Sequence, residues 1–292
     1  MMKVLIGTTH HPVCSGRWMT DAFKRIGVDV RHFGWESEWP HIDAKHYWKP
    51  DADYSHGHWA DWKPDLVLYM DTAYKPWVSQ YPNVPHAVYC TCNAVCNMTM
   101  DTMQHYFVAA YYGPEWPVSG ANMTWLPNAF DPTLHTPSPI PYEDREYDVC
   151  MIGRVDGDRR AITDTMEARG LKVLIDVHRY YEDYVAAYHN SRIGLVYNNQ
   201  QSGMMRIFET AAMGCVVLSN PILDYELLKP RGIEIFAHAD AVDAADKAEM
   251  ILDNPEYAKR MISNAQVWVR PHTWDARAQQ VARWIEETYA TE

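Results

Sequence analysis

The segment from residue 198 to residue 209 holds the side chains whose types and spacing best suit chemistry. A polar stretch follows an apolar run, and Ser202-Gly203 then opens a helical pattern. Ser202 is a candidate N-cap, and Gly203 lets a ligand approach the backbone closely. Arg206 and Glu209 are three residues apart, so they share one face of that helix.

This helix is predicted to be buried, because the residues on both sides of Arg206 and Glu209 are apolar nearly all round. Buried charges need partners. The two side chains could satisfy each other, or Arg206 could bind a diphosphate while Glu209 binds sugar hydroxyls. The plainer alternative is a solvent-exposed Arg–Glu pair.

A second candidate site lies at Gly153–Arg160, where an apolar run ends in a glycine turn before a helix. The first turn of a helix offers free N–H groups and a positive dipole end. Arg154 and Arg160 would add charge-assisted donors for phosphate. The segment lacks the GxGxxG dinucleotide pattern, and an ordinary turn with surface arginines is the alternative. Further along, His178 could stack on a nucleobase or simply belong to a polar turn.

Candidate catalytic bases occur in the first half of the chain. Thr9, His10 and His11 follow the first apolar run, and either histidine could deprotonate a hydroxyl. Local capping or packing is the alternative for both histidines. Asp71 ends another apolar run and is the competing base.

The elements that must position these residues alternate in type. In the second half, strand patterns at 147–153, 172–177, 193–197 and 216–219 alternate with helical patterns at 158–169, 181–189 and 204–213. In the first half, strand patterns fall at 3–7, 28–33, 66–70, 87–90, 106–110 and 124–126, with a helix at 16–26. This alternation predicts two parallel sheets of α/β class, which bind ligands in the crevice at their strand ends.

The domain plan follows from composition. Five prolines between residues 127 and 141 indicate a stiff link. We predict an N-terminal domain at 1–127, a linker at 128–146, a C-terminal domain at 147–270 and a last helix at 271–292. Helices are expected at 241–252, 256–269 and 274–289.

Residues 35–63 form a Trp- and His-rich insert, which either presents an aromatic acceptor surface or packs down on its own tryptophans. Its His and Asp residues could also bind metal (His41, Asp43, His46, Asp51, Asp53, His56, His58 and Asp61). The other metal candidate is Cys90, Cys92 and Cys96. Structural zinc sites usually pair two Cys motifs, so buried free thiols are favoured for these cysteines.

The charge balance limits the partners. The net charge is −12, with 10 Lys and Arg against 15 Asp and Glu up to residue 145, and 16 against 23 after it. Neither half is basic, which argues against non-specific nucleic-acid binding and against an anionic membrane surface. With no long apolar run, no secretory signal and six scattered cysteines, we expect a cytoplasmic chain without membrane spans.

From residue 147 onward the chain resembles the CgeB-like (spore maturation protein B-like) group-1 glycosyltransferases. The resemblance rests on YDVCMIG at 147–153, on GMMRIFETAAMGCVVLSN at 203–220 and on the tail ILDNPEYAKRMISNAQVWVRPHTWDARAQQV at 251–281. The junction WLPNAFDP at 125–132 is also similar to that of the family.

The resemblance implies a GT-B fold, with two Rossmann-like domains facing across a cleft and C-terminal helices crossing back. It implies a nucleotide-diphosphate sugar as donor, no cofactor and no metal. The donor-binding residues would be Gly153, Arg154, Arg160, His178, Ser202, Gly203, Met204, Arg206 and Glu209. The candidate acceptor-binding residues on the N-terminal domain are Thr9, Trp18, Cys92 and Asn93.

The expected reaction is transfer of a sugar to a hydroxyl of a glycan, a small molecule or a modified nucleobase, including one in DNA. His10, His11 or Asp71 would act as base if configuration is inverted, and no base is required if it is retained. The alternatives are a non-catalytic nucleotide- or glycan-binding protein of the same fold and a nucleotide-sugar epimerase. The sequence leaves the oligomeric state open.

Overall fold

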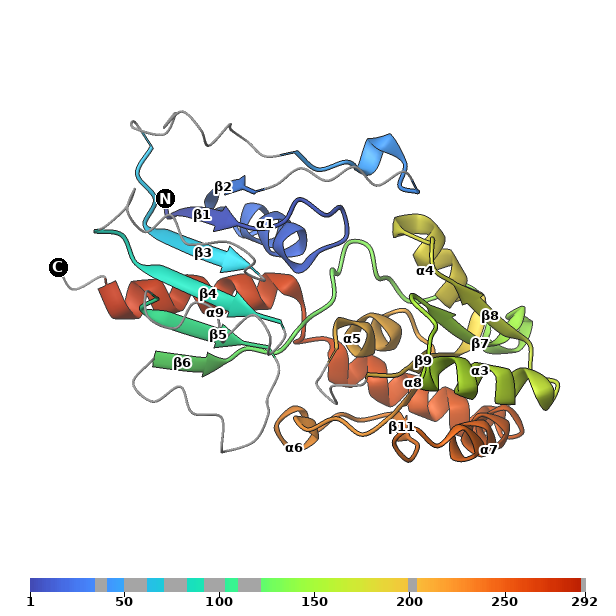
Figure 1. Ribbon diagram of the computed structural model, residues 1–292. Helices are drawn as coiled ribbons and strands as arrows, with labels where there is room; N and C mark the ends of the chain where they lie inside the picture. The colour runs from blue at the N-terminus through green and yellow to red at the C-terminus, as the bar shows by residue number, and fades with distance from the viewer. Residues whose placement is uncertain are drawn as a thin grey trace. The chain divides into compact units, whose positions relative to one another are not determined.

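The computed structural model describes the chain in two compact units. The described residues are 1–34, 41–49, 62–70, 83–91, 103–109, 122–198 and 204–289. Unit 1 consists of Met1–Asn128 together with Trp274–Glu292, and unit 2 consists of Ala129–Thr273. Both units are drawn in Figure 1.

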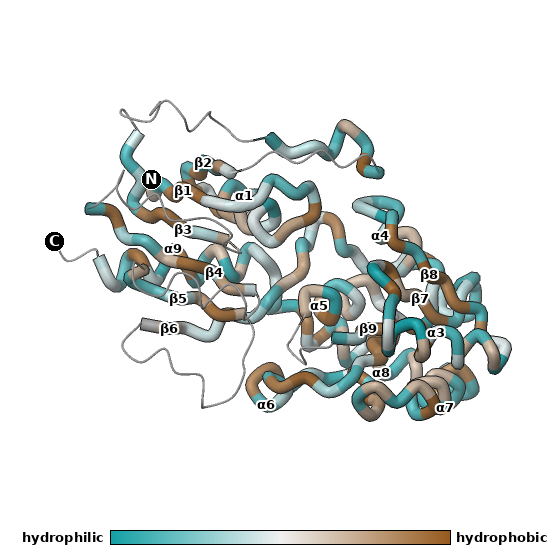
Figure 2. The backbone as a smooth tube through the Cα atoms, viewed as in Figure 1, coloured by the Kyte–Doolittle hydropathy of each residue, from teal (hydrophilic) through white to brown (hydrophobic). Residues whose placement is uncertain are grey.

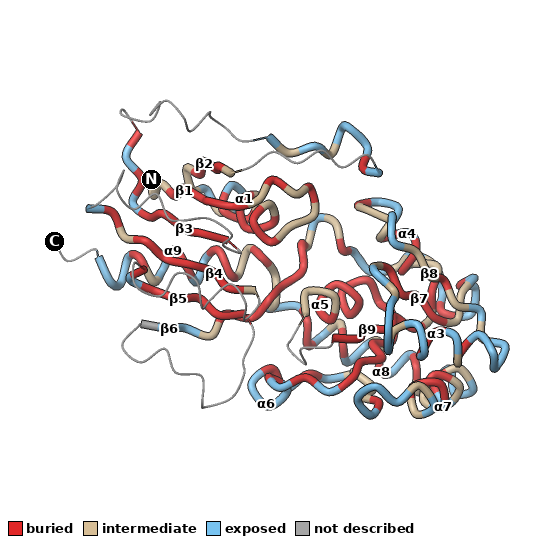
Figure 3. The backbone as a smooth tube through the Cα atoms, in the orientation of Figure 1, coloured by how far each residue is buried: buried red, intermediate tan, exposed pale blue. Residues whose placement is uncertain are grey.

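Unit 1 is built on a six-stranded parallel sheet in the order β2-β1-β3-β4-β5-β6. Its strands are β1 (Lys3–Gly7), β2 (Asp29–Phe33), β3 (Leu66–Met70), β4 (His86–Cys90), β5 (His105–Val108) and β6 (Asn122–Trp125). Every residue of β3, β4 and β5 is buried, as the red tube in Figure 3 shows. Such strands are typical of a parallel sheet covered on both faces.

Helices α1 (Ser15–Arg25) and α9 (Trp274–Tyr289) pack against each other in unit 1. The Sγ of Cys14 caps α1 by accepting a hydrogen bond from the Arg17 N–H. The last helix is joined to the end of the first-half sheet by Arg277, whose Nε donates to the Pro127 carbonyl at 2.7 Å. Two segments far apart in sequence therefore form one core.

Unit 2 holds a five-stranded parallel sheet in the order β11-β10-β9-β7-β8. Its strands are β7 (Tyr147–Ile152), β8 (Val173–Asp176), β9 (Ser191–Val196), β10 (Val216–Ser219) and β11 (Ile233–Ile235). Its helices are α3 (Asp158–Ala168), α4 (Tyr181–His189), α5 (Met205–Ala212), α6 (Tyr225–Leu228), α7 (Ala241–Leu252) and α8 (Pro255–Val269).

Strand β7 shows how this sheet is covered on both faces. Val149 and Met151 join the core beneath α3, α7 and α8, whereas Cys150 and Ile152 join the core on the side of α4. Successive residues of a strand point to opposite faces, so one strand feeds both cores. The apolar character of β4 and β7 is visible in Figure 2.

The two parallel sheets with interleaved helices confirm the predicted α/β class. Helices α4, α7 and α9 and strands β1, β3 and β10 have the predicted bounds, and the bounds of the other predicted elements shift by one or two residues. Strand β11, helix α6 and the short 3₁₀ helices at Ala44–His46 and Tyr142–Asp144 were not predicted from the sequence. These elements have three or four residues each, too few to show a periodicity.

The described part of the Trp- and His-rich insert packs on unit 1. Trp48 stacks on His32 at 4.4 Å between ring centroids, and Trp62 Nε1 donates to Asp29 at 2.8 Å. For these two tryptophans the packing alternative holds. Trp35, Trp39 and Trp59 lie outside the described residues, as do Asp51, Asp53, His56, His58 and Asp61.

The cysteines divide into two groups. Cys14, Cys150 and Cys215 are free thiols, as expected. Cys90 is disulfide-bonded, so the expectation of a free thiol is wrong for this residue. Within the part of the chain that the structure describes, no cluster of three or more His, Cys, Asp or Glu side chains could hold a metal ion. Over the same residues, no helix combines the length and the apolar character needed to cross a bilayer.

Candidate functional site

At the carboxyl end of the sheet in unit 2, two of the predicted donor-binding residues, Gly153 and Arg206, lie close together. Gly153 directly follows β7, and its φ of +129° lies in a region that favours glycine. A Cβ added there would lie 2.9 Å from Arg206 Nη2. Residues 153 and 206 are far apart in sequence, and the missing side chain at Gly153 makes room for the guanidinium of Arg206.

Arg206 carries a cation that no described residue neutralises by an ion pair. The residue is half-buried near the start of α5, and its Nε is buried without a hydrogen-bond partner in the described structure. Burial lowers the pKa of Arg206, but Tyr188, Tyr184 and Glu209 around it more than offset this and the pKa is raised. Arg206 is thus a permanent positive charge next to Gly153, which has no side chain to cover it.

Arg159 is a second guanidinium at the same strand ends. It lies in the first turn of α3, where Nε and Nη2 donate to the Tyr197 carbonyl at 3.2 and 2.9 Å and Nη1 donates to the Arg154 carbonyl at 2.8 Å. Burial lowers the pKa of Arg159, and the positive charge of Arg206 lowers it further. Two like charges held close together at strand ends favour an anion between them.

The other two arginines of residues 153–160, Arg154 and Arg160, are paired with carboxylates at the surface. Arg154 is exposed and pairs with Asp156 at 2.7 Å, and Arg160 is exposed and pairs with Asp164 at 3.7 Å. Sequence reasoning selected Arg160 and passed over Arg159. The helical spacing of Arg159 with Thr163 and Met166, which are both buried, is the signal that places it on the inward face.

Glu209 is buried on α5 and does not form an ion pair with Arg206 among the described residues. Its Oε2 accepts a hydrogen bond from the Tyr184 hydroxyl at 2.7 Å, and its Oε1 lies 3.7 Å from His135 Nε2. The His135 Nδ1 accepts the Asp131 N–H at 3.1 Å, so the proton of neutral His135 sits on Nε2 and faces Glu209. Of the alternatives considered from the sequence, an ion pair between Arg206 and Glu209 is therefore not the one formed among the described residues.

Helix α5 is buried as predicted, since every residue from Ile207 to Ala212 is buried. Its N-cap is Met204, which provides no side-chain hydrogen bond, so the prediction of Ser202 as N-cap is wrong. Ser202 and Gly203 lie outside the described residues. At the end of β8, His178 is exposed and its N–H donates to Asp176 Oδ1 at 2.9 Å.

Strands β9, β10 and β11 end in a connected polar group. The Asn220 side chain accepts from the Asn198 N–H and donates to the Asn198 carbonyl, both at 2.9 Å, and lies 3.1 Å from His238 Nδ1. The His238 ring stacks on Tyr197 at 5.5 Å and 17°. None of Tyr197, Asn220 and His238 was selected from the sequence as a site residue. For His238 the reason is that it follows β11, a strand that was not predicted.

In unit 1, His10 follows β1 and is 1% exposed. Its ring packs edge-on against Trp48 at 4.7 Å and against His32 at 5.0 Å. Neighbouring His11 is half-buried, its Nδ1 accepts the Val13 N–H at 3.1 Å, and burial lowers its pKa. Of the two candidate bases, His10 is covered by rings and His11 is partly accessible.

The candidate acceptor-binding residues are only partly described. Thr9 is half-buried, and its carbonyl accepts hydrogen bonds from the His11 N–H and the Cys14 thiol. Trp18 is buried on α1. Asp71, Cys92 and Asn93 lie outside the described residues.

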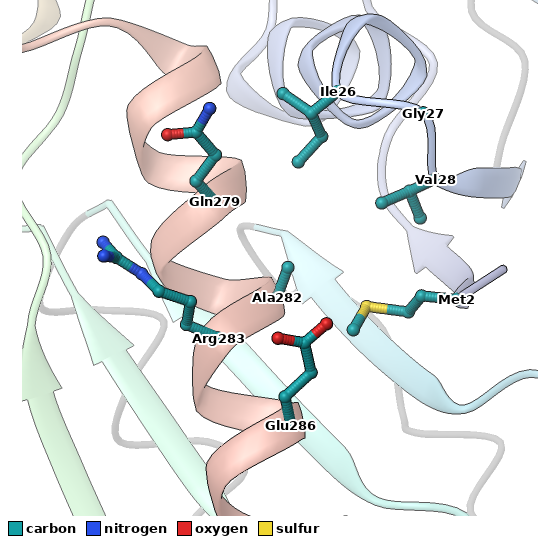
Figure 4. A pocket seen from close by; sticks show the side chains of 8 residues that line it. All are labelled: Met2, Ile26, Gly27, Val28, Gln279, Ala282, Arg283 and Glu286. Atoms are coloured by element: carbon teal, nitrogen blue, oxygen red, sulfur yellow. The ribbon is translucent and has the colours of Figure 1, made fainter.

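A pocket in unit 1 lies at the other edge of the sheet from these residues. Met2 precedes β1, Ile26 to Val28 join α1 to β2, and α9 forms the opposite wall with Gln279, Ala282, Arg283 and Glu286 (Figure 4). Parallel α/β sheets bind ligands at their carboxyl ends, and this pocket is at the amino ends. We therefore do not assign it to the nucleotide.

Comparison with solved structures shows the GT-B fold of glycosyltransferases. Sucrose-phosphate synthase from Thermosynechococcus elongatus matches with a TM-score of 0.70 and 13% identity over 100% of both chains. A glycosyltransferase from Rickettsia africae matches at 0.69 and 10% identity, over 100% of this chain and 99% of that chain. An α-glucosyltransferase in complex with UDP and DNA matches at 0.70 and 11% identity, over 98% and 100%.

Sequence comparison points to the same class. Residues 145–283, just under half of the chain, match the family described as Glycosyl transferase-like. No curated protein matches this chain in sequence. The matched segment includes the strand-end residues from Gly153 to His238, but not Asp131 and His135.

Proposed function

We propose that this protein is a glycosyltransferase that moves a sugar from a nucleotide-diphosphate donor to a hydroxyl acceptor. The observation that carries the proposal is the guanidinium of Arg206, which has no ion-pair partner among the described residues and lies over Gly153 beside Arg159. The pyrophosphate of the donor supplies the missing anion. The glycosyltransferase-like segment and the GT-B fold support this assignment.

The arginines suit both binding and departure of the nucleotide. Charge-assisted hydrogen bonds from guanidinium to phosphate are among the stronger ones in proteins. When the glycosidic bond to the donor breaks, negative charge develops on the leaving diphosphate, and a preorganised cation stabilises that charge. We propose that Arg206 and Arg159 do this without a metal ion, with Arg154, Arg160, Ser202 and Gly203 as the further donor-binding candidates.

The rest of the donor is proposed to lie along the same strand ends. Glu209 is proposed for the ribose hydroxyls, with Tyr184 holding its carboxylate by the 2.7 Å hydrogen bond. Met204 at the N-cap of α5 and exposed His178 after β8 are proposed to line the nucleotide. Each role is a separate hypothesis that a variant can test.

Unit 1 is proposed to bind the acceptor near Thr9, Trp18, Cys92 and Asn93. A general base must be deprotonated at the working pH and within reach of the hydroxyl. Burial lowers the pKa of His11, and its partial accessibility supports it over the ring-covered His10. Neutral His11 carries its own proton on Nε2, so Nδ1 is the nitrogen that would take the proton, and the Val13 N–H must first leave it. Asp71 remains the alternative base, for an inverting reaction.

We further propose that the protein belongs to the CgeB-like subgroup, that its donor carries a hexose and that it is located in the cytoplasm. A modified base in DNA is one of the acceptors we propose to test. The fold is shared with a transferase solved with UDP and DNA, although the acidic charge of this chain favours a small or glycan acceptor.

The test is calorimetric titration of the protein with UDP, ADP and GDP and their sugar conjugates, followed by product analysis with candidate acceptors. Binding of a nucleotide sugar with acceptor-dependent transfer, unaffected by EDTA, is the expected result. Binding without turnover would indicate a binding protein, and an altered sugar formed without acceptor would indicate an epimerase. Absence of any nucleotide binding would overturn the proposal.

A further inference from the structure

An exposed histidine at the end of the sheet in unit 2 is held in one defined orientation and one tautomer. His238 follows β11, and its ring lies flat on Tyr197 at 5.5 Å and 17°. Tyr197 is itself buried and fixed, because its hydroxyl donates to Asp158 Oδ2 at 2.7 Å and its ring stacks on Phe236. The imidazole therefore rests on an ordered support.

The tautomer of His238 follows from the hydrogen bonds of Asn220. The Asn198 N–H must meet an oxygen, so the Asn220 atom it contacts at 2.9 Å is Oδ1. The other terminal atom of Asn220 is then Nδ2, which donates to the Asn198 carbonyl at 2.9 Å. A further contact of this NH₂ group, at 3.1 Å, is with His238 Nδ1, which must act as acceptor. The proton of neutral His238 consequently sits on Nε2, the ring nitrogen that does not contact Asn220.

The same support connects His238 to the arginine pair. The Tyr197 carbonyl accepts the two hydrogen bonds from Arg159, while the Tyr197 ring carries His238. A ligand whose anionic part is held by Arg159 and Arg206 therefore has an oriented N–H donor on the ring that Tyr197 carries, at the end of β11.

We propose that His238 recognises a hydroxyl oxygen on the sugar of the bound nucleotide sugar, through its Nε2–H. The inference rests on the proposed function and assigns to it a residue that determines sugar specificity. The two guanidinium groups are proposed to bind the charged phosphate oxygens, whereas the single N–H of His238 matches the oxygen of a sugar hydroxyl. A site that hydrogen-bonds a substrate hydroxyl discriminates strongly against analogues that lack it.

The experiment compares each nucleoside diphosphate with its own sugar conjugate on the full chain. UDP with UDP-glucose and GDP with GDP-mannose serve as probe pairs, titrated calorimetrically into the wild type, His238→Asn and His238→Gln. The Gln amide nitrogen reaches close to the position of Nε2, whereas the Asn amide nitrogen mimics Nδ1. The nucleoside diphosphate is the internal control, since it lacks the sugar.

We expect His238→Asn to weaken binding of the sugar conjugate about two- to tenfold, the loss of one hydrogen bond, and to leave the nucleoside diphosphate unchanged. His238→Gln should restore part of that loss. Equal weakening of both members of a pair, or no change in either, would overturn the role of His238 while the donor site stands. If the wild type binds no probe pair, the proposed function falls and this inference falls with it.

A spectroscopic readout tests the tautomer independently of activity. Long-range ¹H–¹⁵N correlation spectra of the free protein, assigned by difference with His238→Gln, separate a protonated Nε2 from an acceptor Nδ1. The structure predicts Nε2–H at neutral pH. An Nδ1–H tautomer would remove the outward donor and overturn the proposal.

Discussion

The ends of the first strands in the two units differ in kind, although both strands belong to parallel sheets. After β1, His10 is packed under the rings of His32 and Trp48. After β7, Gly153 leaves space that the guanidinium of Arg206 occupies without an ion pair in the described structure. The first arrangement is stabilised by its own packing, and the second becomes electrostatically complete when an anion is added.

This difference indicates where binding energy for a charged ligand resides. Ring contacts at a strand end contribute to stability through the apolar area they bury and the fit of their shapes, and this contribution depends little on salt concentration. Two guanidinium groups that repel each other are stabilised electrostatically when a phosphate binds between them. We therefore expect variants of unit 2 to change nucleotide affinity, and variants of unit 1 to change stability or acceptor use.

The largest expected effect comes from Arg206→Ala. Removal of a charged hydrogen-bond partner costs about 1.5–3 kcal/mol, so affinity for the nucleoside diphosphate should fall about tenfold or more. Calorimetry measures the affinity for the nucleoside diphosphate. Arg169→Ala is the matched control, because Arg169 lies beyond the far end of α3 and pairs with Asp246 and Glu249. Unchanged nucleotide binding in Arg206→Ala would refute the comparison.

The next effect concerns Gly153→Ala, which adds a Cβ 2.9 Å from Arg206 Nη2 at a φ of +129°. We expect a loss of about 1–3 kcal/mol in the free energy of unfolding and weaker nucleotide binding, because the guanidinium must move. Gly157→Ala is the control. It has a φ of +52° and nothing within 4 Å of the added Cβ, so it should lose stability without losing affinity. Equal affinities of the two variants would count against the close approach.

A smaller effect is expected for Tyr184→Phe. Glu209 Oε2 loses a hydrogen bond of 2.7 Å in a buried position, which should cost about 1–3 kcal/mol in unfolding free energy. Tyr142→Phe is the control, since the Tyr142 hydroxyl is buried without a hydrogen-bond partner among the described residues. Urea denaturation of both variants decides the matter. Equal costs would mean that the Tyr184 hydroxyl does not hold Glu209.

The last effect is a pH dependence of stability that arises in unit 1. Burial lowers the pKa of His105 from 6.5 to about 4. The unfolded chain therefore binds a proton that the folded unit does not, and stability should fall as pH drops from about 6.5 to about 4. The stability of His105→Gln should depend less on pH over this window in urea titrations. An identical slope in wild type and variant would remove His105 as the cause.

Much of the fold could be predicted from the sequence, because apolar runs of strand length alternate with amphipathic helical patterns. The near-continuous apolar run at 193–197 and the helical spacing around Ile207 and Phe208 are of this kind. The three-residue strand β11 could not be predicted, since a half-buried edge strand of that length has no periodicity. His238 was missed for the same reason.

The position of the candidate site, at the carboxyl ends of the strands, was predicted from the sequence. The tertiary structure decided which side chains lie there. Sequence proximity cannot tell whether Arg159 or Arg160 faces the strand ends, because adjacent helical residues point about 100° apart. It also cannot show that Glu209 is held by Tyr184 and not by Arg206, since Tyr184 comes from another helix.

By itself, the sequence determined the element types, the glycine at 153 and the positive charge at 206, because local periodicity and residue chemistry are properties of short segments. Only the tertiary structure decided that residues 153 and 206 meet, that His10 is covered by Trp48, and that Asn220 fixes the proton of His238. Those outcomes depend on side chains brought together from distant segments, and packing is what selects among the orientations that each segment allows.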